Sequence, residues 1–295
     1  MSKNNSLINH RSIFNSFGNA AWRRKMSRKL IYPLISVFIA TSLTISSVSP
    51  SLAFPWRDLI LQGIQLIQLS TLSDNEEVQL GKQINNQLIG REVRLYRNRN
   101  AQRYINRIGQ RLAQASSRPE IPYTFQVVDD DNINAFATMG GFVYINTGLM
   151  KAADNEAELA SVVAHEIAHI AARHAVKQMR QMAIAQGVAT ATGLDENVAV
   201  QIGVELALRR PKSREAEYEA DYLGIQNLGQ AGYAQIGAVT FMEKLLSKGS
   251  VPTFLSTHPA TSSRIASMRE LLAGNPTSGD GLNEAAYRAK VNRLF

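Results

Sequence analysis

The sequence of 295 residues contains no cysteine. This absence excludes disulfide bonds, a cysteine nucleophile, thiolate ligands for zinc and a lipid anchor on an N-terminal cysteine. A catalytic metal ion in this chain must therefore use histidine and carboxylate ligands. A chain without cysteine is compatible with an oxidising compartment, although this absence does not identify one.

Acidic residues are missing from residues 1–53, which carry seven Lys and Arg side chains. The whole chain has 32 basic residues, so 25 remain outside this segment, against 24 acidic residues. The formal net charge of +8 therefore belongs to the N-terminal segment. This distribution argues against a nucleic-acid-binding protein, whose basic residues would lie in the folded domain.

The apolar run over residues 30–45 is short for a membrane-spanning helix, which needs about 20 residues. It follows basic residues that end at Arg28-Lys29 and precedes small residues that suit cleavage after Ala53. These features predict an export signal over residues 1–53. We expect the protein in the periplasm or an equivalent extracytoplasmic compartment, and an uncleaved membrane anchor is the alternative.

The rest of the chain divides into three parts. Residues 54–72 are apolar with spaced glutamines, and we expect a packed helix or linker there. A segment lying on a membrane surface is the alternative, but the lysines typical of such helices are missing. Residues 73–273 are expected to form one domain, and residues 274–295 a linker with a short C-terminal helix. A hydrophobic content of 45% supports a buried core.

Helical periodicity dominates the expected domain, so we predict a mainly helical α+β fold. The longest predicted helix runs from about residue 154 to 182. Three β-rich segments precede it, separated by turn residues, and cover residues 123–129, 134–137 and 142–146. The sequence therefore predicts a small sheet immediately before this helix. Residues 188–208 are apolar but carry acids, and they could form either a mobile lid or a packed helix.

Arginines gather in and before a second predicted helix, at positions 91, 94, 97, 99, 103, 107 and 111. They form either a solvated helix surface or a binding face for anionic lipid or nucleic acid. Aromatic residues that could stack on bases are not interleaved with them. We therefore expect a solvated surface and no nucleic-acid partner.

Only five histidines occur in the chain, yet two belong to the sequence His165-Glu166-Ile167-Ala168-His169. At 3.6 residues per turn, His165 and His169 lie on one helix face and can bind one metal ion. Glu166 can then take a proton from the attacking water. The three ionisable residues also interrupt a stripe that should be buried, so they need partners or a metal. The motif predicts one catalytic Zn²⁺ per chain; hydrogen-bonded histidines and a surface Glu are the alternative.

A catalytic zinc ion usually has a third protein ligand and an open position. The longer motif with three histidines would need Gly at position 172 and His at position 175, and both are Ala. In a continuous helix, His174 would lie about 140° round from His169 and point elsewhere. The third ligand is therefore expected on another helix.

The helix predicted over residues 211–229 offers two acid pairs at a spacing of four, Glu215 with Glu219 and Glu217 with Asp221. Either pair could supply one ligand and one carboxylate that orients a metal-bound His. Small residues lie on the side of the second pair, where two helices could approach closely. This favours Glu217 as ligand and Asp221 as the orienting residue.

The chain resembles the gluzincin-type zinc metallopeptidase family that includes the HtpX, BepA, Oma-type and CAAX prenyl proteases. The resemblance covers about residues 73–272 and rests on five motifs: Asn134-Ala-Phe, Gly140-Gly-Phe-Val-Tyr-Ile-Asn-Thr-Gly148, His165-Glu-Ile-Ala-His-Ile-Ala-Ala-Arg-His174, Ser213-Arg-Glu-Ala-Glu-Tyr-Glu-Ala-Asp221 and Thr257-His-Pro259. It implies a zincin-like domain with Glu217 as the third zinc ligand. It also implies that His258 reaches the active site, where it either stabilises the transition state or caps the zinc.

The sequence departs from two branches of this family. It lacks the multiple membrane spans of HtpX and the prenyl proteases, and it ends without the helical repeats of BepA. It therefore resembles the compact, soluble, exported members, and a prenylated substrate is not expected.

The expected function is zinc-dependent endopeptidase activity on unfolded or misassembled proteins outside the cytoplasm. A largely latent protease that acts as a chaperone or assembly factor is the alternative. His258 is the first candidate for stabilising the oxyanion, and Arg264 the second. The strand Phe142-Val143-Tyr144-Ile145-Asn146 is expected to be a sheet edge that pairs with extended substrate. Contact with a membrane surface is a further expectation, and the oligomeric state is left open.

Overall fold

The computed structural model describes residues 66–188, 193–209, 213–247, 252–259, 262–272 and 278–295. The predicted export signal and most of residues 54–72 lie outside the described residues. Among the helices that are described, none is both long and apolar enough to cross a membrane.

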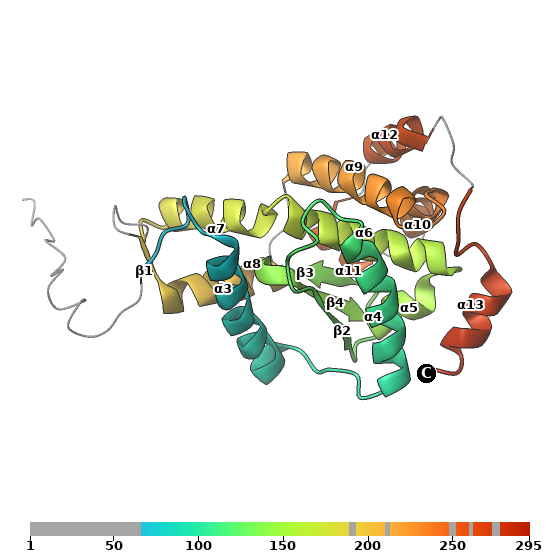
Figure 1. The fold of residues 1–295 in the computed structure, drawn as a ribbon, viewed down its shortest axis with the longest axis horizontal. Coiled ribbons are helices and arrows are strands. Elements are labelled where there is room, and N and C mark those ends of the chain that lie inside the picture. Colours follow the sequence, from blue (N-terminus) through green and yellow to red (C-terminus); the bar gives the residue numbers. More distant parts are fainter. Residues whose placement is uncertain (1–65, 189–192, 210–212, 248–251, 260–261, 273–277) are drawn as a thin grey trace, which may run out of the picture. The chain divides into compact units, whose positions relative to one another are not determined.

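Helices make up most of the described chain (Figure 1). The larger ones are α3 (Asp74–Gln87), α4 (Arg99–Gln114), α6 (Glu156–Ala171), α7 (His174–Ala185), α8 (Glu196–Arg209), α9 (Arg214–Gln230), α10 (Ile236–Ser247) and α12 (Ser262–Leu272). Shorter elements are η1 (Leu88–Glu92), η2 (Met139–Gly141), α5 (Thr147–Ala152), α11 (Thr253–Thr257) and α13 (Glu284–Val291). The mainly helical prediction is confirmed.

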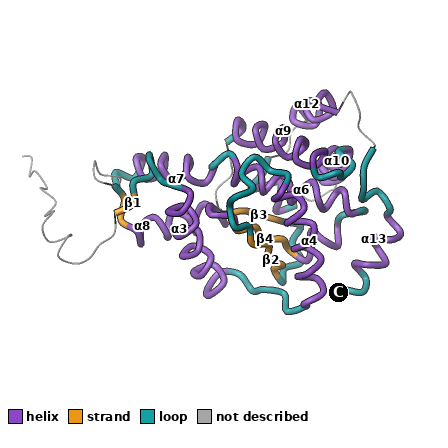
Figure 2. Tube along the Cα trace, viewed as in Figure 1, coloured by secondary structure: helices purple, strands orange, loops and turns teal. Residues whose placement is uncertain are grey.

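The predicted small sheet is present, and Figure 2 shows it as a compact group of strands among the helices. It has the order β2 (Thr124–Val128), β4 (Phe142–Asn146), β3 (Ala135–Ala137). Strand β4 lies in the centre, parallel to β2 and antiparallel to β3. A separate pair joins β1 (Leu66–Ile67) to β5 (Leu194–Asp195).

The prediction that residues 142–146 form a sheet edge is wrong. The backbone of β4 is hydrogen-bonded on both sides, and Phe142, Val143, Tyr144, Ile145 and Asn146 are all buried. Strand β3 lies at the edge of this sheet and packs against α6. A central strand covered on both faces has a continuous apolar sequence, and residues 142–145 show this pattern.

Helix α6 forms the centre of the core. It begins after Asn155, whose side chain accepts a hydrogen bond from the Glu158 N–H. Fourteen of its sixteen residues are buried, because α4, α9, α10 and the sheet surround it. The helix is hydrophobic all round for this reason, and its ionisable residues therefore lie in the interior.

The predicted helix over residues 154–182 is interrupted. Helix α6 ends at Ala171, and α7 begins at His174. Between them Arg173 adopts the left-handed conformation, with φ 56° and ψ 34°. A non-glycine residue pays about 1 kcal/mol or more for this conformation. The Arg173 guanidinium offsets that cost, since its Nε lies 3.1 Å from Glu77 Oε2 and its Nη2 donates to the Leu72 carbonyl.

Within residues 188–208, the described residues from Glu196 onward form a packed helix, preceded by β5. Helix α8 lies against α3 and α7, and its buried residues join a second hydrophobic cluster that also contains β4 residues of the face turned toward it. Of the two alternatives for this segment, the packed helix describes residues 196–209.

Candidate metal centre

Two helices supply most of the predicted site. Helix α6 carries His165, Glu166 and His169, and α9 carries Glu217 and Asp221. The two helices approach closely because α9 has Gly224 at the contact. A Cβ atom built there would lie 3.3 Å from His165 Cα, in tight contact with the α6 backbone. Gly224, a small residue as expected on this side of α9, therefore allows the side chains of α6 and α9 to meet.

Four side chains converge at this contact: His165, His169, Glu217 and His258. His165 Nε2 lies 3.1 Å from His169 Nε2 and 3.3 Å from His258 Nδ1. Glu217 closes the cluster, with Oε1 3.4 Å from His169 Nε2 and 3.1 Å from His258 Nδ1. All four residues are buried.

These distances fit a tetrahedral metal ion. With bonds of about 2.05 Å, two ligands of such an ion lie about 3.3 Å apart. Five separations between donor atoms of the cluster range from 3.1 to 3.5 Å. Two unprotonated ring nitrogens at 3.1 Å would repel each other, so either a proton or a metal ion lies between them. The donor set of three imidazoles and one carboxylate therefore suits a metal ion.

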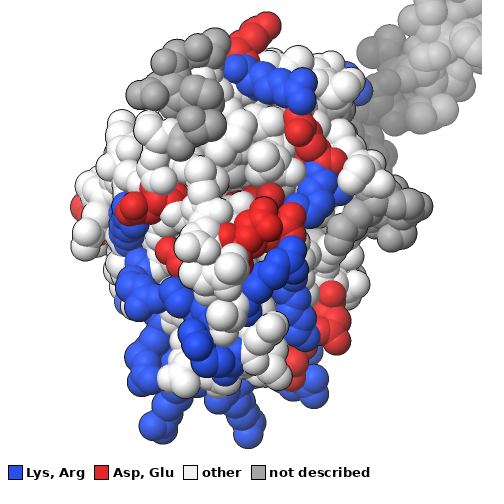
Figure 3. Space-filling model, turned by 90° about the vertical axis from the view of Figure 1, so that its right-hand side faces the viewer, with Lys and Arg blue, Asp and Glu red and all other residues white. Residues whose placement is uncertain are grey.

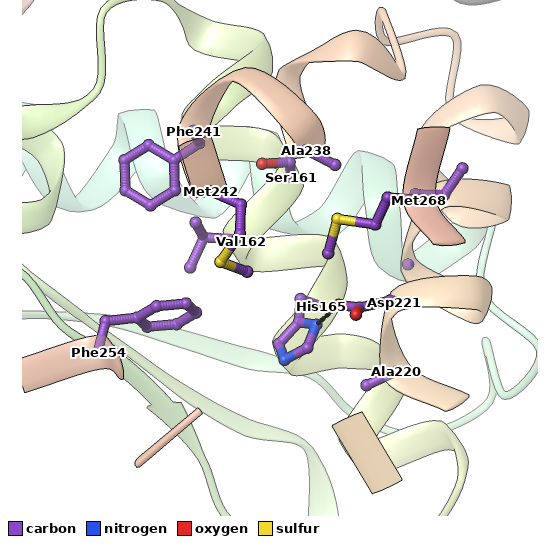
Figure 4. A pocket seen from close by; sticks show the side chains of 12 residues that line it. Ser161, Val162, His165, Ala220, Asp221, Ala238, Phe241, Met242, Phe254 and Met268 are labelled. Carbon is purple, nitrogen blue, oxygen red and sulfur yellow. Dashed lines mark ion pairs between the residues drawn. The ribbon is translucent and has the colours of Figure 1, made fainter. Parts of the chain in front are cut away.

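The second acid of the α9 pair orients His165. Its Nδ1 lies 3.2 Å from Asp221 Oδ1, so Nδ1–H donates to the carboxylate and the Nε2 lone pair faces the cluster. Figure 4 shows this contact as a dashed line between the two side chains. The structure thus gives Asp221 the position that the sequence predicts for it.

Arg264 lies on the opposite side of both carboxylates. Its Nε and Nη2 each donate to Asp221 over 2.7 Å, and Nη1 lies 2.8 Å from Glu217 Oε2 and 2.8 Å from the Pro259 carbonyl. The guanidinium is almost fully buried. Its donors are directed at Asp221, Glu217 and this carbonyl, so the structure does not place it as an oxyanion donor. Arg264 instead fixes the two carboxylates.

His174 and Glu219 form a chain of polar contacts that ends on His169. Its Nδ1 lies 2.8 Å from His174 Nδ1, and His174 Nε2 lies 3.0 Å from Glu219 Oε2. The carboxylate requires a donor, so His174 carries its proton on Nε2 and accepts from His169 Nδ1–H. This tautomer leaves the His169 Nε2 lone pair free to face the cluster.

The pKa directions support neutral rings for His169 and His174 and differ for His165. Burial lowers the pKa of His174 and holds the pKa of His169 well below its ordinary value, so both are neutral at pH 7. Burial also opposes a charge on His165, but Asp221 and Glu217 raise its pKa to about 9. For Glu217 burial acts upward, and the surrounding histidines overcome it and hold the pKa well below the usual range. The cluster therefore holds a negative carboxylate beside a protonated His165, and a bound metal ion would take the place of that proton.

His258 links the cluster to Glu166. Its Nδ1 is one of the converging atoms, and its Nε2 lies 3.3 Å from Glu166 Oε1. It comes from the end of α11, where Phe254 stacks on its ring at a centroid distance of 4.7 Å. His258 thus occupies the fourth corner of the cluster, between the three other donors and Glu166.

A small apolar cavity of about 20 Å³ lies beside His165 (Figure 4). Side chains of α6, α9, α10, α11 and α12 line it, among them Val162, Phe241, Met242, Phe254 and Met268. Its apolar walls reduce the local dielectric constant, which strengthens the charge interactions of the centre.

Sequence reasoning missed three contributors. It set the pair Glu215/Glu219 aside in favour of Glu217/Asp221, it directed His174 away from His169, and it considered Arg264 only as an oxyanion donor. The break at Arg173 brings His174 back to His169, and no Gly, Pro or Asn in residues 171–174 indicates it. The spacing of four between Glu215 and Glu219 was the available indication for Glu219.

Comparison with known proteins finds a matching family and several similar proteases. Residues 99–272 match peptidase family M48. The beta-barrel assembly-enhancing protease of Escherichia coli K12 is 33% identical over 261 residues, covering 83% of this chain and 53% of that protein. The mitochondrial metalloendopeptidase OMA1 of Schizosaccharomyces pombe is 29% identical over 176 residues, covering 57% of this chain and 52% of that protein. The chain thus spans about half the length of these relatives.

Proposed function

Because the chain belongs to peptidase family M48, we propose that it is a zinc-dependent metalloendopeptidase that cleaves unfolded or misassembled proteins outside the cytoplasm. The observation that carries this proposal is the convergence of His165, His169 and Glu217 at tetrahedral distances beside Glu166. A similar protein named for assembly enhancement and another named as a metalloendopeptidase support it.

His165, His169 and Glu217 would hold one zinc ion. When bound, the ion would act as a Lewis acid on the scissile carbonyl and the attacking water. Glu166 takes the proton of that water and passes it to the leaving amine. Asp221 and the His174–Glu219 chain keep the two histidines in the tautomers that a metal needs.

In the structure, His258 closes the site to an attacking water. Its Nδ1 takes the corner that an attacking water would need, and its Nε2 faces Glu166. Catalysis then requires His258 to leave that corner, after which its ring could donate to the oxyanion. This geometry supports the alternative of a largely latent protease that binds unfolded proteins as a chaperone or assembly factor.

Extended substrate would pair with β3, the edge strand over Ala135–Ala137, in place of β4. Pairing through backbone groups reads little side-chain sequence, which suits broad action on unfolded chains. The predicted export signal supports a periplasmic or equivalent location, where contact with a membrane surface is also expected.

The test measures zinc content and cleavage of a permanently unfolded protein by residues 54–295. We expect one zinc per chain, cleavage of the unfolded protein and much slower cleavage of its folded form. Glu166→Gln should retain zinc and lose cleavage. Equal rates on folded and unfolded forms would contradict the substrate class, and suppression of aggregation by Glu166→Gln would support the chaperone alternative.

A further inference from the structure

The arginines of α4 and the C-terminal residues form one surface. We define the arginine face by its members: Arg91, Arg97, Arg99, Arg103, Arg107, Lys290 and Arg293. The C-terminal part is held beside α4, because Asn98 Nδ2 donates to the Leu294 carbonyl and the rings of Tyr96 and Phe295 lie 5.2 Å apart. Figure 3 shows basic side chains gathered on this side of the molecule.

Lys290 and Arg107 meet over the same ring. Lys290 Nζ lies 4.7 Å from the Tyr104 centroid, and Arg107 Cζ lies 5.5 Å from it. Arg91 and Arg97 line a shared hollow formed by residues 89–97, the segment that connects α3 to α4. The face therefore unites segments that lie almost 200 positions apart in the sequence, and its charges are neighbours in space.

Most of these charges lack a carboxylate partner. Within the described residues, Arg91, Arg97, Arg99, Arg103 and Arg107 form no ion pair with Asp or Glu, and neither does Arg293. Lys290 is the exception, since its Nζ lies 3.6 Å from Glu156 Oε2, and the nearby Asp129 pairs with Arg94 over 2.9 Å. Glu92 is the exposed acid next to Arg91.

The positions of the arginines oppose helix stability. Arg99 lies in the first turn of α4, which carries no acid, although cations are unfavourable at the positive end of the helix dipole. Arg99, Arg103 and Arg107 also follow each other at a spacing of four, where like charges repel. The folding of α4 does not require these charges, since buried apolar residues hold its other face.

From this arrangement we propose that the arginine face binds the anionic headgroups of a phospholipid bilayer. Guanidinium groups pair with phosphate oxygens in a bidentate manner, and several of them side by side attract a negatively charged surface. The half-exposed Phe295 lies at the border of the face, where an aromatic ring can enter the headgroup region. The predicted export signal brings the chain to a membrane.

Nucleic acid fits the face less well. Tyr104 is buried beneath Arg107 and Lys290, and Tyr96 is covered in part by Phe295, so neither ring is open to stack on a base. The face also contributes no residue to the metal centre, so it would hold the enzyme at a surface without occupying its site.

The experiment measures cosedimentation of residues 54–295 with vesicles of phosphatidylcholine, with and without phosphatidylglycerol. We expect binding only with phosphatidylglycerol, and weaker binding as salt rises. The triple variant Arg99→Gln, Arg103→Gln, Arg107→Gln should bind on the order of tenfold or more weakly, since each charge near an anionic surface contributes separately. Its cleavage of unfolded protein in solution should be unchanged, which also shows that it folds.

A matched control removes three exposed charges from other helices, with Lys82→Gln, Arg180→Gln and Arg214→Gln. These changes lower the net charge equally, so the control should bind nearly as the original chain does. An equal loss of vesicle binding in the control would show that net charge alone determines binding, and it would overturn the proposal. Equal binding to both vesicle types, or tighter binding to duplex DNA than to anionic vesicles, would overturn it as well.

Discussion

The metal centre and the arginine face both contain many charged side chains, but these charges are paired in the centre and mostly unpaired on the face. In the centre, Glu217 and Asp221 share the Arg264 guanidinium at distances of 2.7 to 2.8 Å, and histidines surround them. On the face, arginines lie next to other arginines with their charges turned to solvent. The carboxylates of the centre are thus paired within the chain by Arg264 and the histidines. The arginines of the face have no carboxylate partner among the described residues, so their charges remain available to a binding partner.

The free energies differ accordingly. Removing one partner of a buried ion pair costs about 3–5 kcal/mol, because the other charge stays in the interior. Exposed charges contribute about 1 kcal/mol or less. Substitutions in the centre should therefore damage stability or chemistry, and substitutions on the face should leave the fold intact. The following predictions test this difference, from the largest effect to the smallest.

Glu166→Gln should lower the rate of peptide cleavage by about 10²–10⁴-fold, because the amide cannot take a proton from the attacking water. Zinc content and the thermal unfolding midpoint should stay close to those of the original chain. The comparison uses initial rates on an unfolded protein at equal zinc content. A variant that retained most of its activity would assign the base to another residue.

Arg264→Leu should lower the free energy of unfolding by about 3–5 kcal/mol, since Glu217 and Asp221 would lose their shared cation in the interior. Urea denaturation of the zinc-free protein measures this loss without a contribution from the metal. Arg269→Leu is the matched control, because Arg269 pairs with Glu243 at the surface. Similar losses in both variants would remove the distinction between the two regions.

Glu219→Gln should weaken zinc binding, and His174→Leu should weaken it by about 10–100-fold, because His169 would lose the group that fixes its tautomer. Competition with a chromogenic chelator measures this affinity directly. Glu215→Gln is the control on the same helix, since Glu215 is exposed and contacts neither histidine. An unchanged zinc affinity in His174→Leu would show that the contacts of His174 and Glu219 contribute to packing and do not fix the His169 tautomer.

Arg99→Glu should raise the free energy of unfolding by about 0.3–1 kcal/mol, because an acid at the start of α4 matches the helix dipole. The same change should weaken binding to anionic vesicles. A variant that is more stable and binds less would show that the face sacrifices stability for binding. A loss of stability would indicate that Arg99 has a structural partner.

Much of the site could be predicted from the sequence because it depends on local helical spacing. His165 and His169 share a helix face, and the small residues beside Glu217 and Asp221 allow the close approach of α9. The family predicted from the motifs is confirmed. These inferences needed only the periodicity of single helices and one contact between two of them.

The remaining features depend on tertiary structure. Strand order is not encoded by alternation within a strand, so β4 could be taken for an edge although β3 returns to its far side. The left-handed Arg173 is retained by Glu77 and Leu72, which lie about 100 positions earlier in the chain. Arg264 becomes the partner of Asp221 only when α12 packs on α9.

At position 173, the backbone conformation and the side-chain contacts favour different amino acids. Its backbone favours glycine, which would relieve the strain, whereas its side chain must be arginine to reach Glu77 and the Leu72 carbonyl. A change to glycine would therefore make the local backbone easier to fold and the joint between α6 and α7 looser. Because His174 directly follows this joint, the angle at which its ring meets His169 is governed from α3, an element with no residue in the metal centre. Glu77 of α3 and His174 of the metal centre are thus linked through one residue, Arg173.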